Sequence, residues 1–324
     1  MLKDRFNEVI SKFKSKKILV IGDLMLDTYL IGQSNRISPE APVPIIEVNK
    51  VEHNLGGAAN VALNLSSLGC KVSLVGLIGD DPEGQVFRAL LDKSNIDFTS
   101  LVESENRPTT VKSRIISHDQ QVIRTDREIT FDLSDESNNE LITITSSAIE
   151  NVDAVILEDY NKGVLNPLSI SKIINIAKKL NKPIYVDPKV KNFDLYKDVR
   201  LFKPNLSEFR TFCKENTSLR KDGFELKKNL NADILMVTRS AEGVSLFVDT
   251  DYHDIPTKAR KVHDVSGAGD TVIATFTLSD LSGATPEESV VLSNFAAGRV
   301  CEELGVVPIS LAMLNEMIEH HNNL

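Results

Sequence analysis

Short apolar runs alternate along the chain with longer amphipathic segments. The runs are continuously apolar, which is typical of strands covered by helices on both faces. They predict strands at residues 18–23, 72–79, 153–159, 183–189, 200–205 and 233–240. The segments between them predict helices that include residues 57–69, 166–181, 268–281 and 285–304. This alternation predicts an α/β fold of three layers, with a mainly parallel central sheet between two layers of helices.

Two segments break this rhythm. Residues 28–53 alternate polar and apolar positions and carry several prolines, and residues 108–129 predict a hairpin that turns near His118 and Asp119. We expect the two segments to form a small antiparallel sheet that projects from the main domain as a lid, a dimer interface or both. The organisation predicted is a single domain over residues 1–324 with these lid segments inserted in it.

Composition narrows the function classes. The 324 residues carry a formal charge of −9, which argues against nonspecific binding to nucleic acid or to anionic membranes. No apolar run is long enough to span a bilayer, and the N-terminus lacks the continuous apolar core of a signal peptide. Cys70, Cys213 and Cys301 form no CxxC pair and no zinc cluster. We therefore expect a cytoplasmic enzyme or binding protein with structural thiols.

The stretch DVSGAGDT at residues 264–271 has glycines where a helix is expected to begin. Gly267 and Gly269 would let the backbone N–H groups, with Ala268 between them, point at an anion at the positive end of that helix. Asp270 would then lie beside the anion and orient a hydroxyl group that attacks phosphorus. A glycine turn capped by an aspartate explains the same residues, and the stretch by itself does not decide between these readings.

The other predicted strands also end in polar residues, and ligands of open α/β sheets bind at that edge. Gly56, Gly57 and Asn60 open a helix and suit a polyhydroxy ligand, although a tight helix start explains them equally well. Asn205 and Glu208 either hold Mg²⁺ through water or form a helix cap, and both roles are compatible. The remaining polar strand ends carry Asp23, Asp27, Asp159, Lys162, Asp187, Lys189, Thr238 and Gly243. So many polar ends at one edge favour an enzyme.

Taken in order, GGAAN, NLSE and DVSGAGDT resemble the signatures of the ribokinase/PfkB family of ATP-dependent sugar kinases, and the resemblance extends from Ile18 to about Pro308. It implies that the loop at 267–269 is an anion hole and that Asp270 is the catalytic residue. It also implies ATP and Mg²⁺ as partners of the reaction. Thr238, Gly243 and Asn294 would line the nucleotide pocket, and Asp264 and Ser266 would lie near a monovalent cation such as K⁺.

Further motifs are similar to one group within that family, the kinases of D-glycero-β-D-manno-heptose 7-phosphate. They are RISPEAPVPI, NLGGAANVA, EDYNKG, VDPK, KPNLSE and VTRSAEG, with Leu55 and Lys203 as small departures beside them. The resemblance implies formation of the 1,7-bisphosphate on the route to ADP-heptose and lipopolysaccharide. In many bacteria this kinase is fused to a nucleotidyltransferase, which we expect to be absent here because the chain ends at Leu324 without an HxGH-type motif.

The resemblance assigns the sugar to the acidic and glycine-bearing strand ends. Predicted sugar ligands are Asp23, Asp27, Gly56, Gly57, Asn60, Asp159 and Asp187. A substrate phosphate at carbon 7 needs a cationic partner. The candidates are Arg36, Arg114, Arg124, Lys162 and Lys189, although Arg36 and Arg124 would equally serve the lid or its salt bridges.

Two alternatives remain at this stage. The first is a kinase for another phosphosugar or a nucleoside, although RISPEAPVP and the scarcity of aromatic residues argue against a base pocket. The second is a non-catalytic sugar-binding protein, which predicts loss of catalytic residues that are present here. An exposed edge of the lid sheet would also favour a homodimer.

Overall fold

A computed structural model describes residues 2–118, 120–213, 218–257, 264–303 and 305–322. Within these residues a ten-stranded sheet has the order β14-β13-β12-β11-β10-β9-β1-β4-β5, with β6 paired to β4. The pairings from β12 through β9 and β1 to β5 are parallel, whereas β13 and β14 are antiparallel. The predicted mainly parallel sheet is therefore confirmed, and all six predicted strands lie in it.

The bounds of the elements follow chain order. The strands of the main sheet are β1 Lys17–Gly22, β4 Lys71–Gly79, β5 Ile96–Asp97, β6 Leu101–Ser104, β9 Ala154–Glu158, β10 Ile184–Asp187, β11 Leu201–Phe202, β12 Ile234–Thr238, β13 Val244–Val248 and β14 Asp251–Ile255. The α-helices are α1 Leu2–Ser11, α2 Ala58–Ser67, α3 Pro82–Leu91, α4 Asp135–Glu150, α5 Pro167–Lys179, α6 Leu206–Phe212, α7 Leu219–Leu230, α8 Ala268–Leu281, α9 Pro286–Val300 and α10 Leu311–Asn322. Short 3₁₀ turns are η1 Phe13–Ser15, η2 Val190–Leu195 and η3 Ser240–Glu242.

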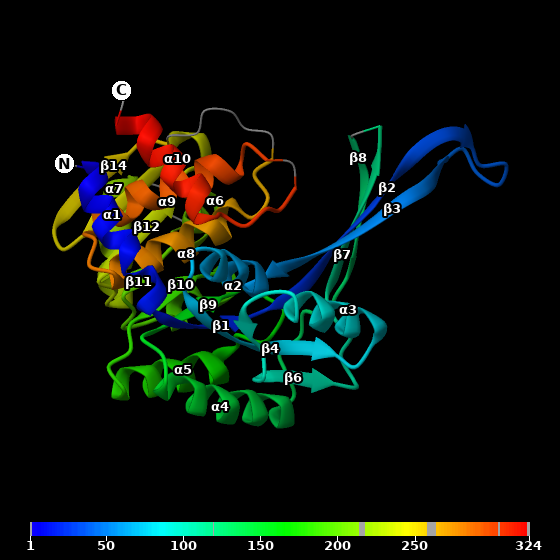
Figure 1. Cartoon of the computed structure of the whole chain (residues 1–324). Helices are drawn as coiled ribbons and strands as arrows, with labels where there is room; N and C mark the ends of the chain where they lie inside the picture. Colours follow the sequence, from blue (N-terminus) through cyan, green and yellow to red (C-terminus); the bar gives the residue numbers. More distant parts are fainter. Residues whose placement is uncertain (1, 119, 214–217, 258–263, 304, 323–324) are drawn as a thin grey trace.

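Helices cover both faces of the main sheet, as the continuously apolar strands predict (Figure 1). One buried cluster joins one face of the strands to α1, α2, α3, α8, α9 and α10, and the other joins the opposite face to α4, α5, α6 and α7. Neighbouring residues of a strand belong to different clusters: Ile156 faces the first and Leu157 the second. This alternation decides which polar residues at the strand ends can meet.

The lid is a separate four-stranded sheet in the order β3-β2-β7-β8. Its strands are β2 Leu24–Ile37, β3 Pro44–Gly57, β7 Val111–Ser117 and β8 Gln120–Arg127, and Figure 1 shows them projecting well beyond the main body. Our expectation of an antiparallel sheet was wrong in one pairing, because β2 and β7 run parallel. Both strands run from the main body towards the lid tip. The chain returns from each along an antiparallel neighbour, β3 for β2 and β8 for β7.

The C-terminal part also differs from the sequence prediction. Helix α9 ends at Val300, before the predicted end at residue 304, and a further helix, α10, contains His320 and His321. The His321 ring packs on Phe295 with ring centres 4.5 Å apart. Among the described helices, none combines the length and the apolar character needed to cross a bilayer.

Candidate active site

Three polar side chains meet at the carboxyl edge of the main sheet because of strand alternation. Glu158 ends β9, Asp187 ends β10 in register with it, and Lys203 follows β11. Each lies two residues beyond a member of the first buried cluster, so all three face the side that α8 covers. The Lys203 ammonium is 2.6 Å from an Asp187 oxygen, and both side chains are almost completely buried.

Asp159, the predicted sugar ligand, points to the opposite face. Its carboxylate accepts hydrogen bonds from Tyr196 Oη at 2.7 Å, from Asn192 at 3.1 Å and from the Asn161 backbone. The side chain is 0% exposed. Asp159 therefore stabilises the loop after β9, and Glu158, which we did not predict, is the carboxylate on the site side.

The N-terminus of α8 brings Asp270 to this carboxylate edge. Gly267 is the N-cap with φ of 77°, a conformation that glycine adopts readily, and an added Cβ would stand 2.8 Å from the Asn60 amide nitrogen. The Asn60 amide donates to one Asp270 oxygen at 2.6 Å, and Tyr160 Oη donates to the other at 2.8 Å. Burial raises the pKa of Asp270 to about 6 against these two hydrogen bonds. Asp270 is thus an oriented, buried carboxylate.

Tyr160 is the main site residue that sequence reasoning missed. It follows Glu158 and Asp159 in the motif EDYNKG, but we weighed only the charged members of that motif. The Lys112 and Lys189 ammonium groups lie 5.4 and 5.1 Å from the centre of its ring. Burial and the adjacent Asp270 raise the pKa of Tyr160 well above its usual value, so the phenol remains a donor.

Asn205 and Glu208 form the helix cap that the sequence permits. Asn205 accepts from the Glu208 backbone N–H, and one Glu208 oxygen accepts from the Asn205 backbone N–H, both at 2.9 Å. The other Glu208 oxygen lies 2.5 Å from the Lys189 ammonium. Burial alone would lower the pKa of Lys189, but Asp187 and Glu208 outweigh it and raise it. The predicted phosphate ligand Lys189 is therefore ion-paired, and the predicted water-mediated role of Asn205 and Glu208 in binding Mg²⁺ stays a prediction.

Asp23 anchors the loop that carries Tyr160. Its carboxylate accepts from the backbone N–H groups of Tyr160, Lys162 and Val164 at 2.8 to 3.2 Å. Burial raises the pKa of Asp23 to about 6, and Asp159 acts in the same direction. These bonds engage both oxygens that we had assigned to the sugar, so the structure gives Asp23 a role in holding the loop.

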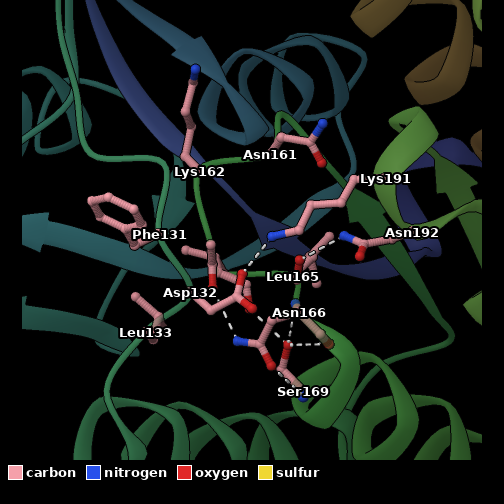
Figure 2. Close-up of polar contacts among 12 residues, drawn as sticks. Phe131, Asp132, Leu133, Asn161, Lys162, Leu165, Asn166, Ser169, Lys191 and Asn192 are labelled. Atoms are coloured by element: carbon pink, nitrogen blue, oxygen red, sulfur yellow. Dashed lines mark hydrogen bonds and ion pairs between the residues drawn. The ribbon is translucent and has the colours of Figure 1, made fainter.

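Figure 2 shows how the next part of this loop is fixed to the body. Asn166 caps α5, accepting from the Ser169 backbone while the Ser169 hydroxyl accepts from the Asn166 backbone. The Asn192 amide donates to the Leu165 carbonyl at 3.0 Å. The Lys162 side chain extends away from these contacts. The loop that carries Tyr160 is therefore fixed at one end by hydrogen bonds to the Asp23 carboxylate and at the other by the cap of α5.

Asp27 lies at the base of the lid, paired with Arg114. The two charged groups are 2.5 Å apart and both side chains are largely buried, and the guanidinium also lies over the Tyr29 ring. A Cβ on Gly56 would stand 2.3 Å from an Asp27 oxygen, so glycine is required there for the ion pair to fit. The Gly57 backbone has φ of 60° where α2 begins.

The other cations proposed for the substrate phosphate are also paired with carboxylates. Arg36 and Arg124 lie in the exposed lid, and Lys162 lies near its base. Their partners are Glu47, Asp126 and Glu128, at 3.4, 2.9 and 2.6 Å. Lys112, which we did not consider, is different: among the described residues no carboxylate is within ion-pair distance of it. Burial lowers the pKa of Lys112 and outweighs the opposing attraction of Asp27, which lies beyond ion-pair distance.

A cavity of about 610 Å³ opens beside the cap of α6. It is lined by Asn205, Leu206, Ser207, Arg210, Thr211, Thr238, Arg239 and Ser240. Of the predicted nucleotide residues, Thr238 and Asn205 lie in this lining. Gly243, with φ of 92°, closes the turn before β13, where a Cβ would clash with the Ile255 carbonyl.

Three further predicted positions lie in α9 or just before α8: Asn294, Asp264 and Ser266. Asn294 donates to the Pro256 carbonyl at 3.3 Å. Asp264 accepts from the Ser266 backbone at 2.9 Å, which forms a tight turn before α8. Another cavity, of about 760 Å³, lies at the opposite, amino edge of the sheet, beside Lys17 and Lys71 and where α2 and α4 end. It is remote from Asp270 and contains none of the predicted site residues.

Comparison with known proteins agrees with the resemblance predicted from the motifs. Residues 15–311 match the model of a protein family described as "pfkB family carbohydrate kinase". The bifunctional protein HldE of Haemophilus influenzae (strain PittEE) is 42% identical over 313 residues, which are 95% of this chain and 64% of that protein. The bifunctional protein HldE of Helicobacter pylori (strain G27) is 42% identical over 300 residues, which are 91% of this chain and 65% of that protein. The chain thus spans about two thirds of the length of these relatives.

Solved structures resemble the fold. Phosphofructokinase-2 from Escherichia coli, in complex with fructose-6-phosphate, has a TM-score of 0.78 at 17% identity, covering 94% of this chain and 99% of that chain. Arabidopsis thaliana ribokinase, complexed with ribose and ATP, has a TM-score of 0.72 at 18% identity, with the same coverage. At these identities the likeness establishes a ribokinase-like fold.

Proposed function

The chain belongs to the pfkB family of carbohydrate kinases, and we propose that it phosphorylates D-glycero-β-D-manno-heptose 7-phosphate with ATP at the anomeric hydroxyl. The product would be the 1,7-bisphosphate, on the route to ADP-heptose and lipopolysaccharide. The identity with the two HldE proteins over most of this chain supports the assignment. The segment RISPEAPVP supports it further, because it resembles the heptose kinases specifically.

The observation that carries the kinase mechanism is Asp270, fixed by Asn60 and Tyr160 at the N-terminus of α8. In the reaction the sugar hydroxyl oxygen forms a bond to the γ-phosphorus of ATP and gives its proton to the Asp270 carboxylate. The bond from that phosphorus to the bridging oxygen breaks, and ADP leaves. Because the transition state is loose, the orientation of the hydroxyl matters more than its early deprotonation.

The backbone of the same turn stabilises the phosphate. The N–H groups of Gly267, Ala268 and Gly269 precede or begin α8, where the helix dipole favours negative charge. A donor that is aligned with developing charge contributes about 3 kcal/mol. Glycine at 267 allows the turn to lie against Asn60, so the anion site and the general base are built from one short segment.

The nucleotide is assigned to the cavity beside Thr238, and the resemblance assigns Gly243 and Asn294 to the nucleotide as well. Mg²⁺, when bound, would neutralise the phosphate charge, and Asn205 and Glu208 would hold it through water. Asp264 and Ser266 are assigned to a monovalent cation such as K⁺. These assignments follow the resemblance stated for the motifs.

The preference for a phosphorylated sugar rests on Lys112. Its ammonium lies beside Tyr160, which contacts Asp270, and among the described residues it has no carboxylate partner. Arg36, Arg114, Arg124, Lys162 and Lys189 are already ion-paired. A cation that is partly buried without a counterion is stabilised by an incoming phosphate, so Lys112 is the best candidate to hold the phosphate at carbon 7.

The lid is also assigned as the interface of a homodimer. Four apolar side chains on β3 and β8 are about half exposed: Val48, Val51, Val122 and Ile123. Apolar side chains on a projecting sheet with free edges favour pairing with a second copy. Sedimentation equilibrium of the wild type and of a Val51→Lys, Ile123→Lys variant tests this assignment, since a lid dimer should dissociate in the variant.

The function is tested by measuring ADP release with Mg·ATP across a panel of acceptors. The panel holds D-glycero-D-manno-heptose 7-phosphate, the unphosphorylated heptose, fructose 6-phosphate, ribose and adenosine. We expect turnover on the heptose 7-phosphate and little on its unphosphorylated form. Turnover on fructose 6-phosphate alone would keep the kinase and overturn the substrate. No turnover on any acceptor, with the sugar still bound, would favour a non-catalytic sugar-binding protein.

A further inference from the structure

A second buried asparagine, Asn64, lies about one helical turn after Asn60 on α2. The two residues are 1% and 2% exposed. Positions four residues apart lie on the same face of a helix, so their side chains can meet. The Asn64 amide contacts the Asn60 amide, which in turn donates to Asp270, although no step of the reaction requires Asn64 directly.

The Asn64 amide uses its full capacity for hydrogen bonds. Its Nδ2 atom donates to the Asn60 carbonyl at 2.8 Å and to Asn60 Oδ1 at 3.3 Å. Its Oδ1 atom accepts from the Ile309 backbone N–H at 3.0 Å and from the Thr271 hydroxyl at 3.1 Å. An amide group has two donor protons and an oxygen with two lone pairs, so each is engaged. Asn64 therefore connects α2 to α8 and to the segment before α10.

The Ile309 backbone decides which way the Asn64 amide faces. A backbone N–H can only donate, so the amide oxygen must lie opposite it, whereas the Thr271 hydroxyl could pair with either end of the amide. The Asn64 nitrogen then faces Asn60, and the Asn60 oxygen must accept from it. The Asn60 nitrogen is left to face Asp270, to which it donates at 2.6 Å. One backbone proton thus sets two amide groups in series.

The orientation of Asn60 matters because its two ends act oppositely on Asp270. The nitrogen donates to the carboxylate and holds it, whereas the oxygen in the same place would be a second acceptor and would repel it. With Asn60 reversed, Asp270 would lose one of its two side-chain donors and keep Tyr160. The position of the proton acceptor relative to the attacking hydroxyl governs the rate of the transfer, so such a change should lower kcat.

The anchor for this chain of hydrogen bonds is itself fixed by packing. Ile309 is 0% exposed and belongs to the first buried cluster, together with α2 and α8. Val306, three residues earlier, lies against the turn before α8, since a Cβ on Gly267 would stand 3.3 Å from its side chain. Residues 305–309 therefore contact the anion turn through Val306 and the Asn60 amide through Ile309 and Asn64.

We propose that Asn64 is a positioning residue of the kinase, which orients the Asn60 amide toward Asp270 from its anchor on the Ile309 N–H. The hydrogen bonds of Asn64 reach Asp270 through Asn60, so its effect on the reaction depends on Asn60. The inference rests on the proposed role of Asp270 as proton acceptor and is independent of which sugar is phosphorylated.

The test is a double-mutant cycle between Asn64 and Asn60, read by steady-state kinetics of the full chain. Asn64→Leu keeps a similar volume and removes the amide, and kcat should fall about 10- to 100-fold while the KM for ATP stays within about threefold. In an Asn60→Ala background the same Asn64→Leu change should lower kcat by less than about threefold, because the group that it orients is gone.

A control separates positioning from general stability. Tyr185→Phe removes a buried hydrogen bond of 2.6 Å to Asp280, near the opposite end of α8. It should lower the free energy of unfolding while kcat stays within about twofold of the wild type. Near-UV circular dichroism checks that each variant is folded. Should Asn64→Leu not fold, Asn64→Ser is judged by the same criteria, since a helical serine hydroxyl can keep the bond to the carbonyl four residues earlier.

The proposal is overturned if the folded Asn64 variant turns over as the wild type does. It is also overturned if the losses in kcat of the two single variants multiply in the double variant, because Asn64 would then act independently of Asn60. Any acceptor of the panel serves for these measurements, so a different sugar leaves the cycle unchanged. Multiplying losses with an active wild type overturn this inference alone, whereas a wild type inactive on every acceptor overturns the proposed function and this inference together.

Discussion

The carboxyl edge of the main sheet and the lid both carry many charged residues, but they use them differently. At the sheet edge Asp187, Lys203 and Asp270 are almost completely buried and each makes a short, directed contact. On the lid, Arg36 and its partner Glu47 are more than half exposed. A buried charge must be matched by its surroundings, whereas an exposed one is solvated and contributes little. The comparison indicates that specific chemistry belongs to the buried edge, and that the exposed ion pairs of the lid contribute little to it.

The largest expected effect comes from Asp270. Asp270→Asn keeps the size of the side chain and removes the proton acceptor, so kcat should fall about a thousandfold or more. The affinity for ATP, measured by titration calorimetry, should stay within about threefold. Asp251→Asn, at an exposed position in β14, is the matched control. Near-normal turnover of Asp270→Asn would remove Asp270 from the mechanism.

The next effect concerns the phenol that orients Asp270. Tyr160→Phe removes the hydrogen bond to Asp270, and kcat should fall about 10- to 100-fold while the KM for ATP changes little. Tyr196→Phe removes an equally buried bond, but to Asp159 on the other face of the sheet. Steady-state kinetics of the two variants compare the faces directly, and equal losses in kcat would contradict the assignment of Tyr160.

A smaller effect is expected from the unpaired cation at the base of the lid. Lys112→Gln should raise the KM for a phosphorylated acceptor about tenfold, because a charge-assisted contact to phosphate contributes about 1.5 kcal/mol. The matched control is Arg124→Gln, which removes a positive charge already paired with Asp126 in the exposed lid. Equal effects of the two variants on KM would show that the positive charge of the lid as a whole, and not Lys112 in particular, attracts the phosphate.

The smallest effect concerns the attachment of the lid to the body. Asp81 caps α3 and accepts hydrogen bonds from Thr109 just before β7, and it contacts Arg127 of β8. Partial burial alone would raise the pKa of Asp81, but the bonds from Thr109 and Gly84 outweigh it and lower the pKa. Asp81→Asn should therefore lower the free energy of unfolding by about 1 kcal/mol at pH 7.

The pH dependence of that difference follows from the sign of the shift. A carboxyl group with a lowered folded-state pKa contributes stability above its unfolded pKa of about 3.9 and loses it as pH falls through the lower folded value. Urea unfolding of wild type and Asp81→Asn should give curves that converge below about pH 4. A difference that grows on acidification would contradict the role of the Asp81 charge.

The sequence predicted the fold well and the site in part. Continuous apolar strands and their spacing were enough for the parallel sheet, and glycine chemistry with the family signatures indicated the turn before Asp270. The choice between Glu158 and Asp159 was out of reach, because it depends on which face the last residue of β9 points to. A shift of one residue in the strand end exchanges the two faces.

Pairing partners were equally hidden. Each cation proposed for the substrate phosphate proved to be paired with a carboxylate. For Arg114 and Lys189 that carboxylate is distant in sequence. Lys112 could have been considered, because it lies in the predicted lid segment at residues 108–129, but only the fold brings it to Tyr160. The parallel pairing of β2 and β7 likewise depends on both strands leaving the body together.

Strand β2 connects the lid directly to the candidate active site. It begins one residue after Asp23, whose carboxylate holds the loop of Tyr160, and continues unbroken for fourteen residues to the lid tip. A displacement of the backbone at the base of the lid would therefore be transmitted through Asp23 to Tyr160, which donates a hydrogen bond to Asp270. The base of the lid and the hydrogen-bond donor of Asp270 therefore share one anchor, Asp23, and a substitution that displaces Asp23 should disturb both.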